Sequence, residues 1–190
     1  MAADSRSTLL MNSLQLFARK GYENVGVQEI VVSSGVTKPT LYHHFGNKIG
    51  LLESLYREGF APLNSRLDAL KAQEFSAADL QTMLEQICIA YFDFTRENPL
   101  FMRLYMAMLF APEESDACQV VMPHATRQHQ TVSSIMIRLG IPAEKAPFMT
   151  ARFIGQIKNH VSWFLMQRGE LDLAAAQNMV LCYLYGALHN

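Results

Sequence analysis

The sequence of 190 residues predicts an all-α fold of about nine helices. Apolar residues recur at intervals of three and four along nearly the whole chain, which places them on one face of each helix. No segment alternates polar and apolar residues for long enough to suggest a sheet. Glycines and prolines separate the periodic segments, at the points where helices end and begin.

Three short helices are predicted near the N-terminus, at about residues 7–20, 27–34 and 38–44. Gly21 and Gly35 end the first two, because glycine readily takes the left-handed conformation that closes a helix. Together these helices form a compact head.

The third of these helices begins with a clear start signal. Thr37 is a natural N-cap, and Pro39 is tolerated in a first turn, where the backbone N–H groups have no intrahelical partner. Leu41 and Phe45 stand four positions apart and point inward. The opposite, exposed face then carries Lys38, Pro39, Tyr42 and His43. Such a surface suits a negatively charged groove better than plain solvent.

Six further helices follow, and the first of them runs from residue 48 to about residue 70. Pro62 lies inside it and removes a backbone hydrogen bond, so a kink is expected near residues 59–62. The remaining five are expected at about 76–96, 100–110, 115–139, 143–168 and 173–188.

Charge is distributed unevenly although the net charge is only −1. Residues 1–50 contain five Lys and Arg against three Asp and Glu, whereas the remainder contains eleven against fourteen. This asymmetry suits a protein that touches phosphate at one end. Lys48 opposes the dipole of the helix that it begins, a conflict that a phosphate at the same helix N-terminus would resolve.

The cysteines and the termini bear on the compartment. Cys88, Cys118 and Cys182 form no CxxC pair, so they are interpreted as buried thiols in a reducing environment. The N-terminus lacks the pattern of a signal peptide. The uncharged stretch 173–190 is a little short to span a membrane and is interpreted as a buried helix. We therefore expect a cytoplasmic protein without a membrane segment.

Residues 8–55 resemble the TetR family of transcriptional regulators, with matched positions at fixed spacing. The positions that carry the resemblance are Phe17, Gly21, Tyr22, Ile30, Gly35, Val36, Lys38, Thr40, Leu41, Tyr42, His44, Phe45, Lys48, Leu51 and Leu52. The resemblance implies a helix-turn-helix DNA-binding domain over residues 1–48, followed by a larger helical ligand-binding and dimerisation domain over residues 49–190.

By this resemblance, residues 38–44 form the recognition helix, which enters the major groove of double-stranded DNA. Phosphate contacts are then expected from Thr37, Tyr42 and Lys48, and base-proximal contacts from Lys38, Pro39, Thr40 and His43. Two departures stand before the second helix, where the family usually has hydroxyl residues and this chain has Val25 and Gly26. They imply a somewhat weaker grip on the DNA backbone. Ser34 replaces a usual alanine.

A recognition helix of about two turns reads few base pairs, so a twofold homodimer on a palindromic operator is expected. The last two predicted helices are the expected dimer surface, because the final one has no charged residue. The expected interface residues are Phe153, Trp163, Phe164, Met179, Tyr183, Gly186 and Ala187.

The larger domain is expected to hold a small, largely apolar or aromatic effector. Methionine is abundant, with eleven in the chain, and its flexible thioether suits a surface that repacks around a ligand. The expected lining residues are Met83, Ile87, Tyr91, Met102, Tyr105, Met106, Gln156 and His160. Tyr105, Gln156 and His160 are the candidate polar anchors.

These observations predict a ligand-responsive regulator, and a repressor released from DNA by its effector is favoured over one that the effector recruits. No cofactor or metal is expected, since His124 and His129 lie five positions apart and diverge on a helix. Two alternatives stay open. An enzyme is disfavoured because no nucleophile–base signature or glycine-rich phosphate loop occurs. A protein-interaction module that no longer binds DNA is disfavoured by Lys38, Tyr42 and Lys48.

Overall fold

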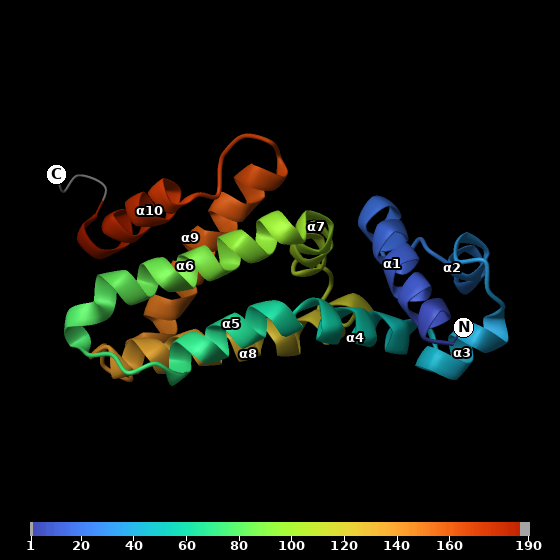
Figure 1. The fold of residues 1–190 in the computed structure, drawn as a ribbon, viewed down its shortest axis with the longest axis horizontal. Coiled ribbons are helices and arrows are strands. Elements are labelled where there is room, and N and C mark those ends of the chain that lie inside the picture. The colour runs from blue at the N-terminus through green and yellow to red at the C-terminus, as the bar shows by residue number, and fades with distance from the viewer. Residues whose placement is uncertain (1, 187–190) are drawn as a thin grey trace. The chain divides into compact units, whose positions relative to one another are not determined.

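The computed structural model describes residues 2–186, and their side chains from residue 5 onward. Within this part of the chain the fold is all-helical, with ten α-helices, one short 3-10 helix and no strand (Figure 1). The helices are α1 (Ala2–Lys20), α2 (Val27–Ser33), α3 (Lys38–Phe45), α4 (Lys48–Gly59), α5 (Ala61–Ala72), η1 (Ala77–Asp79), α6 (Leu80–Glu97), α7 (Pro99–Met108), α8 (Asp116–Arg138), α9 (Ala146–Leu165) and α10 (Leu173–Tyr185). The predicted all-α class is confirmed.

There is one α-helix more than the nine expected, because the helix predicted to kink near Pro62 is two helices. Helix α4 ends at Gly59 and α5 begins at Ala61, with Phe60 between them. Pro62 therefore lies in the first turn of α5, where its missing N–H leaves no intrahelical bond unmade. A Cβ at Gly59 would lie 2.3 Å from Cε2 of Phe101, so glycine permits the close approach of α7 to the end of α4.

The chain divides into two compact units. The N-terminal unit comprises Met1–Phe60 and Pro99–His124, and the C-terminal unit comprises Ala61–Asn98 and Ala125–Asn190. Helices α1 to α4 thus share a unit with α7 and the beginning of α8. The expected division into functional domains at residue 48 stays a prediction.

In the N-terminal unit, α7 packs along α1, and a cluster of aromatic side chains joins α7 to α4. The ring of Phe60 lies 4.8 Å from that of Phe101 and 4.9 Å from that of Tyr105, both edge to face. The buried hydroxyl of Tyr56 donates a hydrogen bond to Sδ of Met108 at 3.0 Å. These contacts hold the end of α4 in a fixed place within the unit.

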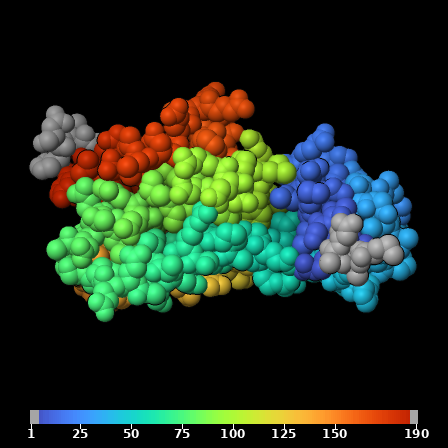
Figure 2. Space-filling view, in the orientation of Figure 1, coloured from blue at the N-terminus to red at the C-terminus, as the bar shows by residue number. Residues whose placement is uncertain are grey.

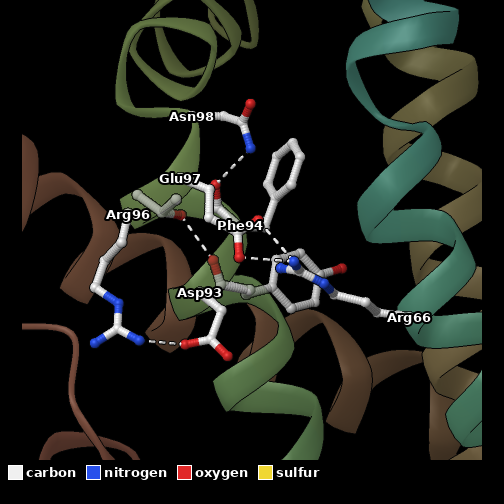
Figure 3. Close-up of polar contacts among 8 residues, drawn as sticks. Arg66, Asp93, Phe94, Arg96, Glu97 and Asn98 are labelled. Carbon is white, nitrogen blue, oxygen red and sulfur yellow. Dashed lines mark hydrogen bonds and ion pairs between the residues drawn. The ribbon is translucent and has the colours of Figure 1, made fainter.

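In the C-terminal unit, α6 is the central helix and contacts α5, α9 and α10. Figure 2 shows α5 and α6 against each other along the visible face. Their ends are joined by an ion pair in which Arg66 reaches across to Glu97, at 2.6 and 2.8 Å (Figure 3). The side-chain amide of Asn98 donates to the carbonyl of Phe94 at 3.1 Å and ends α6. None of the helices in residues 2–186 is both long and apolar enough to cross a bilayer.

Candidate nucleic-acid interface and effector region

Helices α1, α2 and α3 form a tight cluster in the N-terminal unit (Figure 1). The turn after α2 is closed by Gly35, whose φ of +64° is the left-handed conformation predicted for it. The N–H of Val36 then donates to the carbonyl of Val31 at 3.0 Å. From α1, the amide of Asn12 donates to the carbonyl of Ser33 at 2.9 Å and to the hydroxyl of Ser34 at 3.3 Å. Ser34 is thus part of the contact that fixes α2 on α1.

Helix α3 begins where the sequence predicts, with Thr37 at the N-cap position and Pro39 in the first turn. The hydroxyl of Thr37 makes no cap bond to the described backbone; it lies 3.0 Å from the hydroxyl of Thr40 instead. Leu41 and Phe45 are buried, as predicted. Gly26 stands at the N-cap of α2, also without a side-chain bond in the described chain.

The predicted contact face of α3 is largely open to solvent. Tyr42 is 47 % exposed, and the other exposed members are Thr37, Lys38, Pro39 and His43. Thr40 and Lys48 are half-buried. The two inward residues hold this face rigidly, so its side chains are presented from a fixed backbone.

Lys48, at the first position of α4, lies over an aromatic ring of α1's neighbouring turn. Its Nζ is 3.9 Å from the centre of the Tyr22 ring. Burial lowers the pKa of Lys48, while the charges of Glu23 and Asp116 oppose that change. Burial likewise raises the pKa of Tyr22. The amine is therefore held at the N-terminus of α4, as a group that serves a phosphate there would be.

The start of α4 leaves room for such a group. The side chain of Asn47 accepts a hydrogen bond from the N–H of Gly50 at 2.8 Å and caps the helix. A Cβ at Gly50 would lie 2.1 Å from the carbonyl oxygen of Phe45, so only glycine fits between α3 and α4. The recognition helix and the helix that follows it are thereby locked together.

Two ion pairs tie α1 to its neighbours. Arg6 binds Glu58 of α4, with one N–O distance of 3.0 Å, and Lys20 binds Glu29 of α2. The Arg6 hydrogen bond lowers the pKa of Glu58. Both pairs are partly exposed, so each contributes modestly to stability.

The residues predicted to line an effector pocket lie in both units. Met83, Ile87 and Tyr91 are buried on α6 of the C-terminal unit. Met102 and Tyr105 are buried on α7 of the N-terminal unit, where Met106 is half-buried. The effector site as a whole stays a prediction.

Gln156 and His160, expected as polar anchors, are half-buried on α9. They line an open groove of about 530 Å³ between α9 and α10, with Arg152, Gly155, Asn159, Asn178, Met179 and Cys182. The Nδ1 atom of His160 lies 3.0 Å from the carbonyl of Gln156. Cys182, expected to be buried, is exposed here, whereas Cys88 and Cys118 are buried as expected.

A buried amide that sequence reasoning missed lies on α8. Gln128 is 2 % exposed, and its Oε1 accepts from the Tyr91 hydroxyl at 3.4 Å. Its Nε2 has no acceptor among the described residues. On the sequence, Gln128 interrupts an apolar helical stripe that includes Ala125, Val132 and Ile135, and that interruption was the signal that could have found it.

Two titratable groups lie beside this position in the sequence or the fold. Burial lowers the pKa of His129 on α8, and the charge of Lys158 on α9 lowers it further. Burial also lowers the pKa of Lys158 itself. Residues 5–186 contain no cluster of three or more side chains that could hold a metal ion.

Three residues expected at the dimer interface are instead buried within the protomer: Phe153, Met179 and Tyr183. The Phe153 and Tyr183 rings lie 5.1 Å apart, and the Tyr183 hydroxyl donates to the carbonyl of Met149 at 2.8 Å. These helices must also cover α6, so their most apolar side chains turn inward.

The other expected interface residues differ in exposure. Trp163 is 55 % exposed, Phe164 is half-buried and Gly186 is exposed. Ala187 lies outside the described residues. The exposed residues of α9 and α10 that were not predicted include Phe148, Leu181 and Tyr185.

Comparison with known proteins gives a consistent result. Residues 9–55 match the model of the bacterial regulatory proteins of the tetR family. The chain is 24 % identical over 186 residues to the HTH-type transcriptional activator FasR of Mycolicibacterium smegmatis, covering 97 % of this chain and 83 % of FasR. It is 25 % identical over 109 residues to the negative transcriptional regulator IcaR of the biofilm operon icaADBC in Staphylococcus aureus, covering 57 % of this chain and 56 % of IcaR.

The fold also matches solved structures. The transcriptional regulator FadR of Bacillus subtilis, solved in complex with stearoyl-CoA, superimposes with a TM-score of 0.77 at 18 % identity. The match covers 96 % of this chain and 99 % of that one.

Proposed function

The chain belongs to the TetR family of transcriptional regulators, and from that premise we propose that it is a dimeric repressor that a small effector releases from a palindromic operator. Proteins of this family and fold are DNA-binding regulators, not enzymes. The observation that carries the proposal is the open face of α3, which presents Lys38, Tyr42 and His43 from a helix whose other side is buried.

In this proposal α3 enters the major groove with its N-terminal end toward the bases. Lys38, Pro39, Thr40 and His43 are the base-proximal residues, and Thr37, Tyr42 and Lys48 contact phosphates. The capped N-terminus of α4 adds unpaired N–H groups and a helix dipole beside Lys48, which favours an anion at that end. We place the protein in the cytoplasm, where its operator lies.

The effector we propose has an acyl chain. FadR of Bacillus subtilis, whose fold this chain shares, was solved with stearoyl-CoA. The inward face of α6 offers apolar and thioether surface from Met83, Ile87 and Phe94. The Nε2 of Gln128 is a buried donor that would gain an acceptor from a carbonyl or carboxylate oxygen of the ligand, and an unmet buried donor costs free energy.

Ligand binding can act only through different affinities for two states. In the proposed repressor, DNA binding requires the two recognition helices of the dimer to be spaced by roughly 34–36 Å, one turn of the duplex. The effector favours a state with a different spacing. The α4–α5 junction at Phe60 is the proposed hinge, because the chain passes there from the N-terminal to the C-terminal unit.

The dimer surface we propose is formed by the exposed sides of α9 and α10. Helix α10 has no charged residue, yet Leu181 and Tyr185 are exposed on it. Large exposed apolar side chains gathered on one surface are typical of an interface.

Selection of duplexes from a random DNA library by the purified chain tests this function. We expect enrichment of a palindrome, with an affinity that falls as salt rises. Addition of stearoyl-CoA should then reduce binding to the selected duplex. An increase in binding would show instead that the effector recruits the protein to DNA, and the printed function of FasR makes activation the second candidate. The double variant Lys38→Ala/Tyr42→Ala is the control for specific binding.

A further inference from the structure

Helix α9 carries a narrow exposed stripe along its whole length. Phe148 at its start is 68 % exposed and Trp163 near its end is 55 % exposed. Between them, Arg152, Gly155 and Asn159 are also exposed. Intervals of three and four residues place all five on one face of the helix. Two large aromatic side chains thus lie in solvent at opposite ends of one helix face.

The stripe reads alike from either end. Phe148 stands seven positions before Gly155, and Trp163 stands seven positions after Gln156. Arg152 and Asn159 stand three positions before and after the same pair. When two copies of α9 lie antiparallel with a twofold axis at this centre, each aromatic residue meets the other aromatic residue, and each hydrogen-bonding residue meets the other. A twofold interface requires this kind of self-complementarity.

The centre of the stripe allows close approach. Apart from its own helix and chain neighbours, no described atom lies within 4 Å of the position that a Cβ would take at Gly155. The distance between two packed helix axes depends on the side chains at the contact, and glycine permits the short end of that range. Helices in a four-helix interface lie nearly antiparallel, which keeps the ends of the stripe in contact as well.

The groove beside the centre contains an unsatisfied acceptor. The Oε1 atom of Gln156 is buried and has no donor among the described residues. It lines the groove of about 530 Å³ between α9 and α10, which is open to one side. A second α9 laid along the stripe would cover that side and bring the N–H donors of its Arg152 and Asn159 toward the acceptor. The groove is therefore incomplete in a single copy of the chain.

We propose that two copies of this chain associate through an antiparallel α9–α9 contact centred on Gly155. Trp163 of the partner subunit packs on Phe148, Asn159 of the partner subunit lies opposite Arg152, and the partner completes the groove around Gln156. This inference rests on the proposed dimeric function and specifies its register. The guanidinium of Arg152 already lies 5.9 Å from the Phe148 ring and 5.8 Å from the Tyr183 ring, so the polar part of the contact is positioned within each protomer.

Disulfide trapping tests the register. The exposed Cys182 is first replaced by serine, which leaves only the buried Cys88 and Cys118. In that background, Gly155→Cys places one thiol at the centre of the contact, and Phe148→Cys/Trp163→Cys places two at its ends. We expect both variants to form covalent dimers on mild oxidation, since the Cα atoms of a disulfide lie roughly 4.4–6.8 Å apart. Gln130→Cys, at an exposed position of α8, is the matched control and should stay monomeric on a non-reducing gel.

Light scattering on the unoxidised protein separates the two levels of the proposal. A dimer that Gly155→Cys fails to trap overturns the register but leaves a dimeric regulator. A monomer at micromolar concentration overturns both. As an independent measurement, Gly155→Arg should raise the dimer Kd at least tenfold while the protomer keeps its helical circular dichroism, because the Cβ position is open within the protomer. An unchanged dimer Kd in Gly155→Arg would also overturn the register.

Discussion

The amine of Lys48 lies 3.9 Å from the centre of the Tyr22 ring, at the N-terminus of α4. The ring is buried at 4 % exposure and edge-to-face with Phe17 of α1, so its position is fixed by the core of the N-terminal unit. A long, flexible lysine side chain is thereby restricted to one region beside the exposed face of α3. This arrangement lowers the entropy that Lys48 would lose on binding a phosphate.

Removal of the Tyr22 ring should therefore weaken DNA binding through Lys48. Tyr22→Phe keeps the ring and should leave operator affinity within about twofold, whereas Tyr22→Leu should reduce it by roughly 1 kcal/mol, in the range of one cation–π contact. Lys48→Ala should lower the slope of log affinity against log salt by about 0.9, the value for one phosphate. Equal slopes for Lys48→Ala and the wild type would contradict the phosphate contact. Fluorescence anisotropy at several salt concentrations measures all three.

Lys38→Ala should alter the choice of base as well as affinity. A side chain that reaches a base edge contributes about 1–3 kcal/mol of discrimination at that base pair. A second selection from random DNA should therefore return a palindrome that is degenerate at one position in each half-site. Gln130→Ala, exposed on α8, serves as the control. A uniform loss over all sequences would assign Lys38 to the phosphate backbone instead.

Gln128→Leu should stabilise the free protein and weaken the effector. Leucine removes the buried Nε2 that has no acceptor among the described residues, so the free energy of unfolding should rise by about 1 kcal/mol. Affinity for stearoyl-CoA should fall at least tenfold if its acyl oxygen accepts from this amide. Gln130→Leu repeats the change at an exposed position of the same helix and should alter neither quantity. Denaturation and isothermal titration calorimetry provide the two measurements, and an unchanged affinity in Gln128→Leu would remove the amide from the effector site.

The Arg6–Glu58 pair should contribute stability only above acidic pH. The Arg6 hydrogen bond lowers the pKa of Glu58 in the folded state, so the contribution is present above the ordinary glutamate value of about 4.3 and is lost as the pH falls through the lower folded value. Because both side chains are partly exposed, Glu58→Gln should cost only about 0.2–1 kcal/mol at neutral pH. The difference should vanish near pH 3. A constant difference from pH 7 to pH 3 in chemical denaturation would show that packing, not charge, carries the effect.

Pro62→Ala should change the response to effector more than the affinity for DNA. Pro62 lies in the first turn of α5, directly after the break at Phe60. Alanine restores an N–H and favours a continuous helix through residues 48–72, which would stiffen the proposed hinge. The ratio of operator affinities with and without stearoyl-CoA should move toward one, with the ligand-free affinity within about threefold. Parallel loss of both affinities would count against the hinge.

Much of the N-terminal unit could be predicted because its signals are local. Gly35 takes the positive φ that its position between two helices requires, and Pro39 starts α3. Leu41 and Phe45 are buried because they stand four positions apart on a short helix, and Lys38, Tyr42 and His43 are then exposed by the same spacing. Each of these outcomes depends on neighbours within a few positions along the chain.

The outcomes that the sequence did not determine depend on contacts between distant segments. Whether an apolar stripe faces the protomer core or a second copy depends on which helices cover it, so Phe153 and Tyr183 are buried while Phe148 and Trp163 are not. Cys182 is exposed, and Gln128 is buried beside Tyr91, for the same reason. Helical periodicity specifies that a helix has an apolar face, which fixes α3 and its contact surface. Only the tertiary structure decides what that face packs against, because burial is a property of two surfaces and the sequence of one helix describes a single one.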